Sequence, residues 1–178
     1  FKLMQQIRSQ PFSAFNFTDL YGHDKVNLFV LLGKLMDRKS PICLINVLFD
    51  WFSHNFITVK WLNVLSSSFQ VNLGVRQGGA TSPVLFAIYV DDVLVKLNSS
   101  RLGCTVKGLT VNAFMYADDL IILSASVTDL QRLINICVDS LTTIQLSINA
   151  KKCFGMRIGK RFSVDCNNVM IDNYPIQW

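Results

Sequence analysis

The sequence lacks the long apolar run of a membrane-spanning helix. Hydrophobic residues make up 51% of its 178 residues, yet Asp or Lys interrupts every stretch before the roughly 18 consecutive apolar residues that such a helix needs. The first residues also lack the apolar segment and the small-residue cleavage site of a signal peptide. We therefore expect no membrane partner, and an intracellular protein.

Paired cysteine motifs and histidine clusters are absent as well. No two cysteines form a CxxC pair, which argues against a zinc knuckle. Their odd number and apolar neighbours indicate small core side chains in a reducing compartment. His23 and His54 are isolated, so we interpret both as structural. The five cysteines are Cys43, Cys104, Cys137, Cys153 and Cys166.

Glutamate is missing altogether, so all twelve acidic residues are aspartates, and the formal net charge is +5. The basic excess is concentrated in residues 151–161, "KKCFGMRIGKR", which contain five Lys or Arg and no acid. Such a run can bind nucleic acid. The simpler interpretation is one solvated face of a strand.

Four segments have helical patterns. Residues 25–38 and 42–53 show helical spacing of apolar residues. Ser82 followed by Pro83 predicts a helix start, with the helix running to about Leu97. Thr128 and Gln131 form a capping box. It precedes an apolar stripe of Leu130, Leu133, Ile134, Cys137 and Leu141.

Other segments predict antiparallel hairpins. Residues 56–63 alternate and pair with 66–73, and residues 103–112 turn at Lys107–Gly108. A basic strand over 152–158 and a final hairpin turning at Asp172–Asn173 complete the pattern. This order predicts an α+β chain with an antiparallel sheet backed by helices.

The segment "FMYADDLIIL" (114–123) has adjacent acids, Asp118 and Asp119, among apolar residues. Two like charges about 5 Å apart repel by roughly 3 kcal/mol at an effective dielectric of about 20. One interpretation is a hairpin with a polar Ala-Asp-Asp turn. The other is a turn that binds a divalent cation.

A glycine-rich loop, "GVRQGGATSPVLF", begins at Gly74. Its glycines permit backbone shapes that other residues avoid, and they let a ligand approach the main chain closely. The order of this loop, "YADD" and then "LSINAKKC" resembles the reverse transcriptases of non-LTR (LINE-type, jockey-like) retrotransposons. The resemblance covers about residues 12–178.

The resemblance implies the palm of a right-hand polymerase, with part of the fingers present and the thumb missing. Its divisions would be a first-motif strand in about 1–22, fingers and palm helices with a hairpin in 23–75, and palm in 76–178. Both ends look cut, so we expect a single-domain fragment without the thumb or endonuclease. Implied partners are an RNA template, a DNA primer and dNTPs, and the implied site of action is the nucleus.

The resemblance also implies nucleotidyl transfer with two Mg²⁺ ions, or Mn²⁺ in their place. Asp118 would be a metal ligand and Asp119 would support it. Lys152 would protonate the leaving pyrophosphate, although a solvated strand residue is the alternative.

In the glycine-rich loop, Gln77 would position template and nucleotide, and Gly78 and Gly79 would keep the backbone slim beside the bases. Arg76 would contact phosphate, or would be a plain surface residue.

The first motif departs from the family pattern LDxSKAFDxVxHxKL. With His23 as the anchor, Asp19 matches the second Asp, whereas Ser13 stands at the first, metal-bridging Asp. Thr18 replaces the aromatic residue that blocks a ribose 2′-hydroxyl. We therefore expect an impaired polymerase. The alternatives are a catalytically dead nucleic-acid-binding remnant, and a nuclease that shares only the Asp pair.

Overall fold

The computed structural model divides into two compact units, residues 1–22 with 90–178 and residues 23–89. The division falls within helix α4 (Ser82–Ser99). For residues 12–17 and 20–21 the description covers the backbone alone. The described residues are 12–17, 20–21, 25–71, 74, 79–159 and 166–178.

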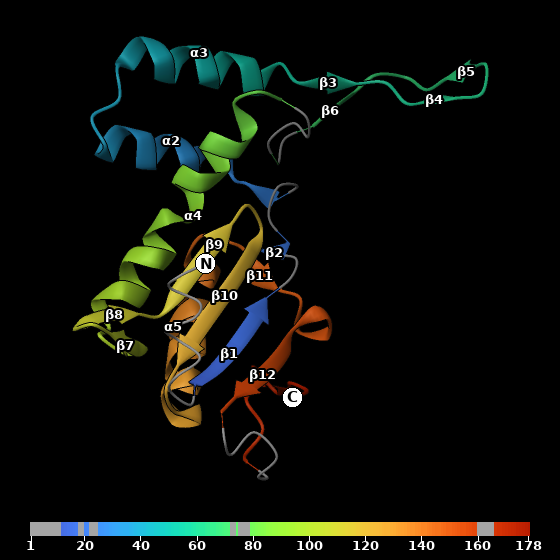
Figure 1. The fold of residues 1–178 in the computed structure, drawn as a ribbon. Coiled ribbons are helices and arrows are strands. Elements are labelled where there is room, and N and C mark those ends of the chain that lie inside the picture. Colours follow the sequence, from blue (N-terminus) through green and yellow to red (C-terminus); the bar gives the residue numbers. More distant parts are fainter. Residues whose placement is uncertain (1–11, 18–19, 22–24, 72–73, 75–78, 160–165) are drawn as a thin grey trace. The chain divides into compact units, whose positions relative to one another are not determined.

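The first unit is built on a four-stranded antiparallel sheet with the strand order β12-β1-β10-β9 (Figure 1). β9 and β10 are neighbours in sequence, whereas β1 and β12 come from opposite ends of the chain. The expected antiparallel sheet is confirmed. Its strands are β1 (Phe12–Phe17), β9 (Ala113–Tyr116), β10 (Asp119–Ser124) and β12 (Phe154–Ile158).

Helix α5 (Val127–Thr143) packs against β10 and β1 on one face of this sheet. On β10 the alternate residues Leu120 and Ile122 are fully buried, as expected for the face of a strand that meets a helix. The predicted apolar stripe of α5 is confirmed, since each of its five members is at most 1% exposed.

The predicted cap of α5 is wrong by two residues. Ser126, not Thr128, is the N-cap: its Oγ accepts a hydrogen bond from the Asp129 N–H at 3.0 Å and donates one to Asp129 Oδ2 at 2.9 Å. Gln131 instead binds both main-chain groups of Met170, at 2.7 and 2.8 Å. The Gln131 amide therefore connects α5 to the strand that begins at Met170.

Three short strand pairs complete this unit. The predicted turns at Lys107–Gly108 and Asp172–Asn173 are confirmed, and Lys107, Gly108 and Asp172 have positive φ, as tight hairpin turns require. The pairs are β2 (Leu20–Tyr21) with β11 (Ser147–Ile148), β7 (Cys104–Val106) with β8 (Leu109–Val111), and β13 (Met170–Ile171) with β14 (Tyr174–Pro175).

Strand β12 begins at Phe154, later than predicted, because Lys151 and Lys152 lie in a short 3-10 helix, η2 (Ala150–Lys152). The basic run is therefore not one continuous strand face. At Gly155 the Trp178 ring lies so close that an added Cβ would be 2.8 Å from it. The Arg157 guanidinium lies 5.3 Å from the centre of the same ring.

The second unit contains α2 (Leu28–Asp37), α3 (Ile42–Ser53) and the first two turns of α4, as predicted. The Asn27 side chain caps α2 by accepting hydrogen bonds from its first N–H groups. Tyr89 of α4 is fully buried, and its hydroxyl accepts a hydrogen bond from Asn27 N at 3.3 Å.

A hairpin joins α3 to the glycine-rich loop, as predicted, but its pairing is broken in two. Nearly all of its large apolar side chains are exposed, including Trp61 at 77% and Leu65 at 64%. Its strands are β3 (Phe56–Ile57) with β6 (Phe69–Gln70), and β4 (Lys60–Trp61) with β5 (Val64–Leu65).

The cysteines behave as expected of core groups at three of five positions: Cys104, Cys137 and Cys153 are buried, and Cys43 is exposed. Burial raises the pKa of the Cys137 thiol and of the Cys153 thiol to about 12. None of the helices within the described ranges is long and apolar enough to cross a membrane.

Candidate functional site

The Asp pair lies at the two-residue turn between β9 and β10. Ala117 and Asp118 form the turn, and Asp119, the first residue of β10, pairs with Tyr116. Ala117 has a φ of +52°, which is uncommon for a residue other than glycine. The backbone therefore reverses sharply between the two strands, and the two carboxylates emerge at one tip.

A rigid base supports this tip. Paired residues share a face, so Tyr116 and Asp119 lie together on the face of β10 opposite Leu120. Tyr116 is 84% exposed and Leu120 is fully buried. Asp118 is half-buried and Asp119 is exposed. The alternation of the sequence predicts this division, although Tyr116 is not among the predicted site residues.

The described part of the chain leaves the oxygen atoms of both carboxylates available for a ligand. Neither Asp118 nor Asp119 forms a hydrogen bond or ion pair with any residue that the structure describes. Hard carboxylate oxygens are the ligands that Mg²⁺ prefers, so the donor set fits such an ion. Within the described residues, no group of three or more acidic, His or Cys side chains could complete a metal site.

Lys152 comes to the same end of the sheet. Phe154, Asn16 and Ile121 lie in one row across β12, β1 and β10. Lys152 precedes Phe154 by two residues, and Asp119 precedes Ile121 by two. Since neighbouring strands are about 4.8 Å apart, the start of β12 lies two strands from the start of β10, at the same end of the sheet. Lys152, the last residue of η2, comes just before β12. Lys152 is exposed.

Ser13 does not come to the Asp pair. The register places Ser13 opposite Ser124 and Phe17 opposite Leu120. At about 3.3 Å per residue, Ser13 is therefore about 13 Å along the strand from the turn end. The expectation that Ser13 occupies the metal-bridging position beside Asp118 is wrong, because the register pairs Ser13 with Ser124, at the far end of β10 from the Asp pair.

The remaining expected residues are only partly described. Arg76, Gln77 and Gly78, together with Thr18 and Asp19, lie outside the described residues. Gly79 is half-buried, and its carbonyl oxygen accepts a hydrogen bond from Ser82 N at 3.2 Å, at the start of α4.

His54 has a structural role, as predicted. Its Nδ1 lies 2.9 Å from the Asp50 main-chain oxygen and 3.2 Å from the Asp50 carboxylate, at the end of α3. His23 lies outside the described residues.

Two curated retrotransposon proteins are similar to this chain. The Pol polyprotein of the type-2 retrotransposable element R2DM from Drosophila melanogaster is 37% identical over 93 residues, which are 52% of this chain and 9% of that protein. The Pol polyprotein of the type-1 element R2 from Popillia japonica is 26% identical over 108 residues, 57% of this chain and 18% of that protein. The chain thus spans less than a fifth of either relative.

Solved structures show the same fold. Telomerase from Candida tropicalis, in complex with a fragment of telomeric RNA, matches 91% of this chain with a TM-score of 0.67 and 13% identity, over 28% of its own chain. Apo telomerase from the same organism, truncated of its C-terminal domain, matches 95% with a TM-score of 0.65 and 16% identity, over 34% of its chain. The expected right-hand polymerase fold is confirmed.

A family model confirms the resemblance seen in the sequence. The model described as reverse transcriptase (RNA-dependent DNA polymerase) matches residues 2–171. Together with the R2 relatives, this match supports a reverse transcriptase domain of the non-LTR retrotransposon type. The chain belongs to the reverse transcriptase (RNA-dependent DNA polymerase) family.

Proposed function

We propose that this chain is the palm of an RNA-dependent DNA polymerase, which adds deoxynucleotides to a primer 3′-hydroxyl along an RNA template. The observation that carries the proposal is the pair Asp118 and Asp119. Two carboxylates that form no hydrogen bond or ion pair with the described residues project from a tight turn whose base is a packed sheet.

In this proposal Asp118 and Asp119 bind the divalent metal ions that the family generally uses, two Mg²⁺ ions or Mn²⁺ in their place. Such ions activate the primer hydroxyl and neutralise charge on the triphosphate. The chain's own contribution is to fix both carboxylates at one tip, so that little rearrangement is needed when the ions bind.

A third carboxylate is needed, and our candidate is Asp19. It follows Phe17 by two residues in the sequence, and Phe17 pairs with Leu120 beside the Asp pair. The register argues against Ser13, which pairs with Ser124 at the far end of β10, and Asp19 is our candidate from its place in the sequence alone.

Lys152 is the proposed proton donor to the leaving pyrophosphate. It comes just before β12, which starts at the end of the sheet that carries Asp119. From the resemblance, Gln77 would position template and nucleotide, Arg76 would contact phosphate, and Gly78 and Gly79 would give the bases room. Action at chromosomal DNA would take place in the nucleus.

Primer extension on an RNA template with Mg²⁺ tests the proposal. We expect Asp118→Asn to lower the rate by about 100-fold or more, because the amide is a neutral and weaker ligand. Asp172→Asn is the matched control, since Asp172 also lies in a two-residue hairpin turn. The metal role is wrong if both variants extend primers as fast as the parent chain.

A nucleic-acid-binding remnant without catalysis is the second candidate. It is supported by the basic run of residues 151–161, which contains five Lys or Arg and no acid. This candidate predicts RNA binding that weakens steeply with salt, with no extension by the parent chain or by Asp118→Asn.

A further inference from the structure

The last residues of the chain lie along the side of β12 that β1 leaves open (Figure 1). Phe154 and Gln177 form a parallel bridge, and Gly155 N donates a hydrogen bond to the Gln177 carbonyl oxygen at 2.7 Å. Since β1 pairs with the other side of β12, the start of β12 is held from both sides. Lys152 precedes Gly155 by only three residues, so it lies next to this double contact.

The Trp178 indole covers one face of β12 at the same place. Its carbon Cε3 would lie 2.8 Å from a Cβ at Gly155, so a larger residue there would have to displace the ring. Two residues further along the strand, the Arg157 guanidinium lies 5.3 Å from the ring centre, which is within the range of a cation–π contact. The indole is therefore held against β12 at two points.

The segment that carries Trp178 is itself anchored in the core of the first unit. Ile176 is 3% exposed, and its N–H donates a 2.8 Å hydrogen bond to the Val169 carbonyl oxygen. The neighbouring strand β13 is bound to α5 by the two hydrogen bonds between Gln131 and Met170. The indole therefore contacts β12 from a segment that the core holds in place.

The turn that carries Lys152 is shaped by local hydrogen bonds. Lys152 N donates to the Asn149 carbonyl oxygen at 3.0 Å, and Cys153 N donates to the Ala150 carbonyl oxygen at 3.3 Å. The Cys153 thiol also donates to the Asn149 carbonyl oxygen, at 3.2 Å. These bonds do not join the turn to the sheet. The residues that follow, at the start of β12, make that connection, and they are the ones that the C-terminal segment contacts.

We propose that Trp178 is a positioning residue for Lys152. The indole holds the start of β12 in place, and β12 in turn fixes where η2 presents the Lys152 ammonium. The inference rests on the proposed function, in which Lys152 Nζ gives a proton to the bridging oxygen of the leaving pyrophosphate as the bond from that oxygen to the α-phosphorus breaks. Position matters for this step, because a proton donor must come within hydrogen-bond distance of the oxygen that it protonates.

The first test is primer extension by the full chain with dNTP analogues whose β–γ bridge is either methylene or difluoromethylene. The methylene analogue releases the more basic leaving group, so its reaction depends more on a proton donor. Trp178→Ala should lower the maximal rate about tenfold with the methylene analogue and less with the other, while the half-saturating concentration changes less than about twofold. Lys152→Met should show the same pattern with a larger loss.

Trp178→Phe, which keeps a flat ring on Gly155, should restore the rate to within about threefold of the parent chain. Tyr174→Ala is the matched control and should leave the rate unchanged. Tyr174 is 45% exposed in the same C-terminal hairpin, and its strand pairs with Ile171 and not with β12. In Lys152→Met, adding Trp178→Ala should cause no further loss, because a positioning residue acts through the group that it positions. An additive loss, or an equal loss with both analogues, overturns the proposal.

Alkylation of Cys153 reports on the same contact without catalysis. Cys153 follows Lys152 and is buried, and burial raises the pKa of its thiol to about 12, so it should react slowly in the parent chain. Trp178→Ala should make Cys153 react severalfold faster, and Tyr174→Ala should not. Equal rates in the parent chain and Trp178→Ala overturn the proposal.

The outcomes separate the positioning role from the polymerase activity. Extension that depends on Asp118, together with no effect of Trp178→Ala on rate or alkylation, would sink the positioning role and keep the enzyme. Faster alkylation of Cys153 in Trp178→Ala, without any extension by the parent chain, would keep the hold of Trp178 on the Lys152 turn and sink the enzyme. Thermal unfolding of each variant shows that the fold is intact.

Discussion

Two hairpins of this chain share a sequence pattern and differ in setting. The β9–β10 hairpin and the hairpin over residues 56–70 both combine apolar strands with a two-residue turn whose first residue has positive φ, Ala117 in one and Leu62 in the other. β10 is paired on both sides and has a fully buried face. In the hairpin of residues 56–70, Leu65 is 64% exposed.

The difference shows that rigidity comes from the sheet around a hairpin more than from the hairpin itself. Isolated two-stranded hairpins are marginally stable, and the pairing over residues 56–70 is interrupted between its two ladders. The backbone that carries the carboxylates at the tip of β9–β10 is held in place by the four-stranded sheet and by α5. The acids would gain no comparable support at the tip of the other hairpin.

A matched pair of leucine truncations should give the largest contrast. Leu120→Ala removes a fully buried side chain behind the Asp pair, and we expect a loss of about 2–5 kcal/mol in unfolding free energy. Leu65→Ala should cost within about 0.5 kcal/mol, because Leu65 is exposed. Urea unfolding measures both, and similar losses would break the comparison.

The reactivity of the cysteine thiols should show the same contrast, between a buried residue of the first unit and an exposed residue of the second. At pH 8 Cys137, with a pKa of about 12 against an ordinary 9.0, should have a thiolate fraction about 1000-fold lower than a normal thiol. Alkylation should therefore modify exposed Cys43 first, as mass spectrometry would show. Early modification of Cys137 would mean that the packing behind β10 opens readily.

The raised pKa of Cys137 also determines whether the protein gains or loses stability as the pH rises. The buried neutral thiol stabilises the fold fully below the ordinary pKa of 9.0, and this contribution is lost as the pH rises toward the folded pKa of about 12. The melting temperature should fall over that window, and it should fall less steeply in Cys137→Ala.

The smallest expected effect is that of Ser13→Asp. The register puts Ser13 opposite Ser124, so a new carboxylate there is remote from the Asp pair, and the primer-extension rate should not increase. Asp19→Asn is the companion variant and should lower the rate. A large gain from Ser13→Asp would show that the register differs in the working enzyme.

Most of the fold could be predicted from periodicity and turn chemistry. The α5 stripe, α3 and the turn at Lys107–Gly108 follow from local sequence, because burial and positive φ leave direct signals. The cap of α5 was misplaced because Thr128 with Gln131 imitates the spacing of a capping box. Gln131 in fact binds Met170, a long-range contact without a local signal.

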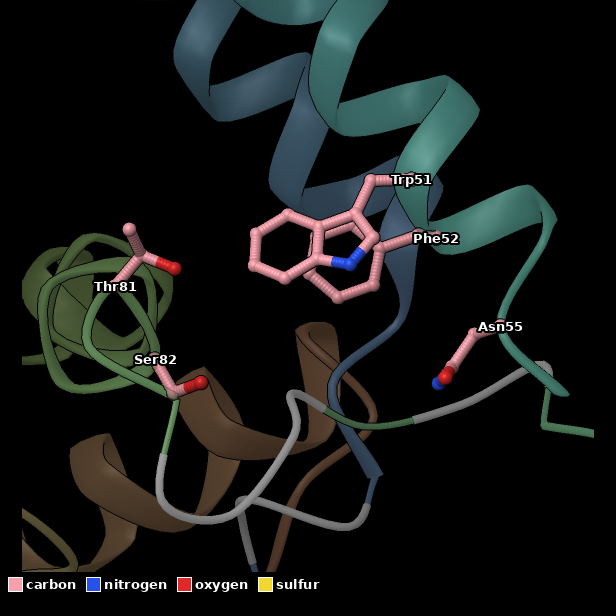
Figure 2. Close-up of a pocket in the computed structure, with 5 residues that line it drawn as sticks. All are labelled: Trp51, Phe52, Asn55, Thr81 and Ser82. Atoms are coloured by element: carbon pink, nitrogen blue, oxygen red, sulfur yellow. The ribbon is translucent and has the colours of Figure 1, made fainter. Parts of the chain in front are cut away.

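The site was predictable in part. Asp118 and Asp119 stand out because two adjacent acids in an apolar segment repel each other, and a bound cation would offset that repulsion. The position of Ser13 depends on the register between β1 and β10, which no local pattern in the sequence fixes. A small hollow lined by Trp51 and Thr81 joins the end of α3 to the start of α4 (Figure 2), residues about thirty apart, so only the folded chain brings its parts together.

The contact between Gly155 and Trp178 has a consequence for the outer margin of the sheet. Gly155 N donates a 2.7 Å hydrogen bond to the Gln177 carbonyl oxygen, and the indole occupies the space where any other side chain would begin. An alanine there would push the indole away and expose unpaired main-chain groups. Trp178 thus covers part of the edge strand β12, which makes it harder for another molecule to add a strand there.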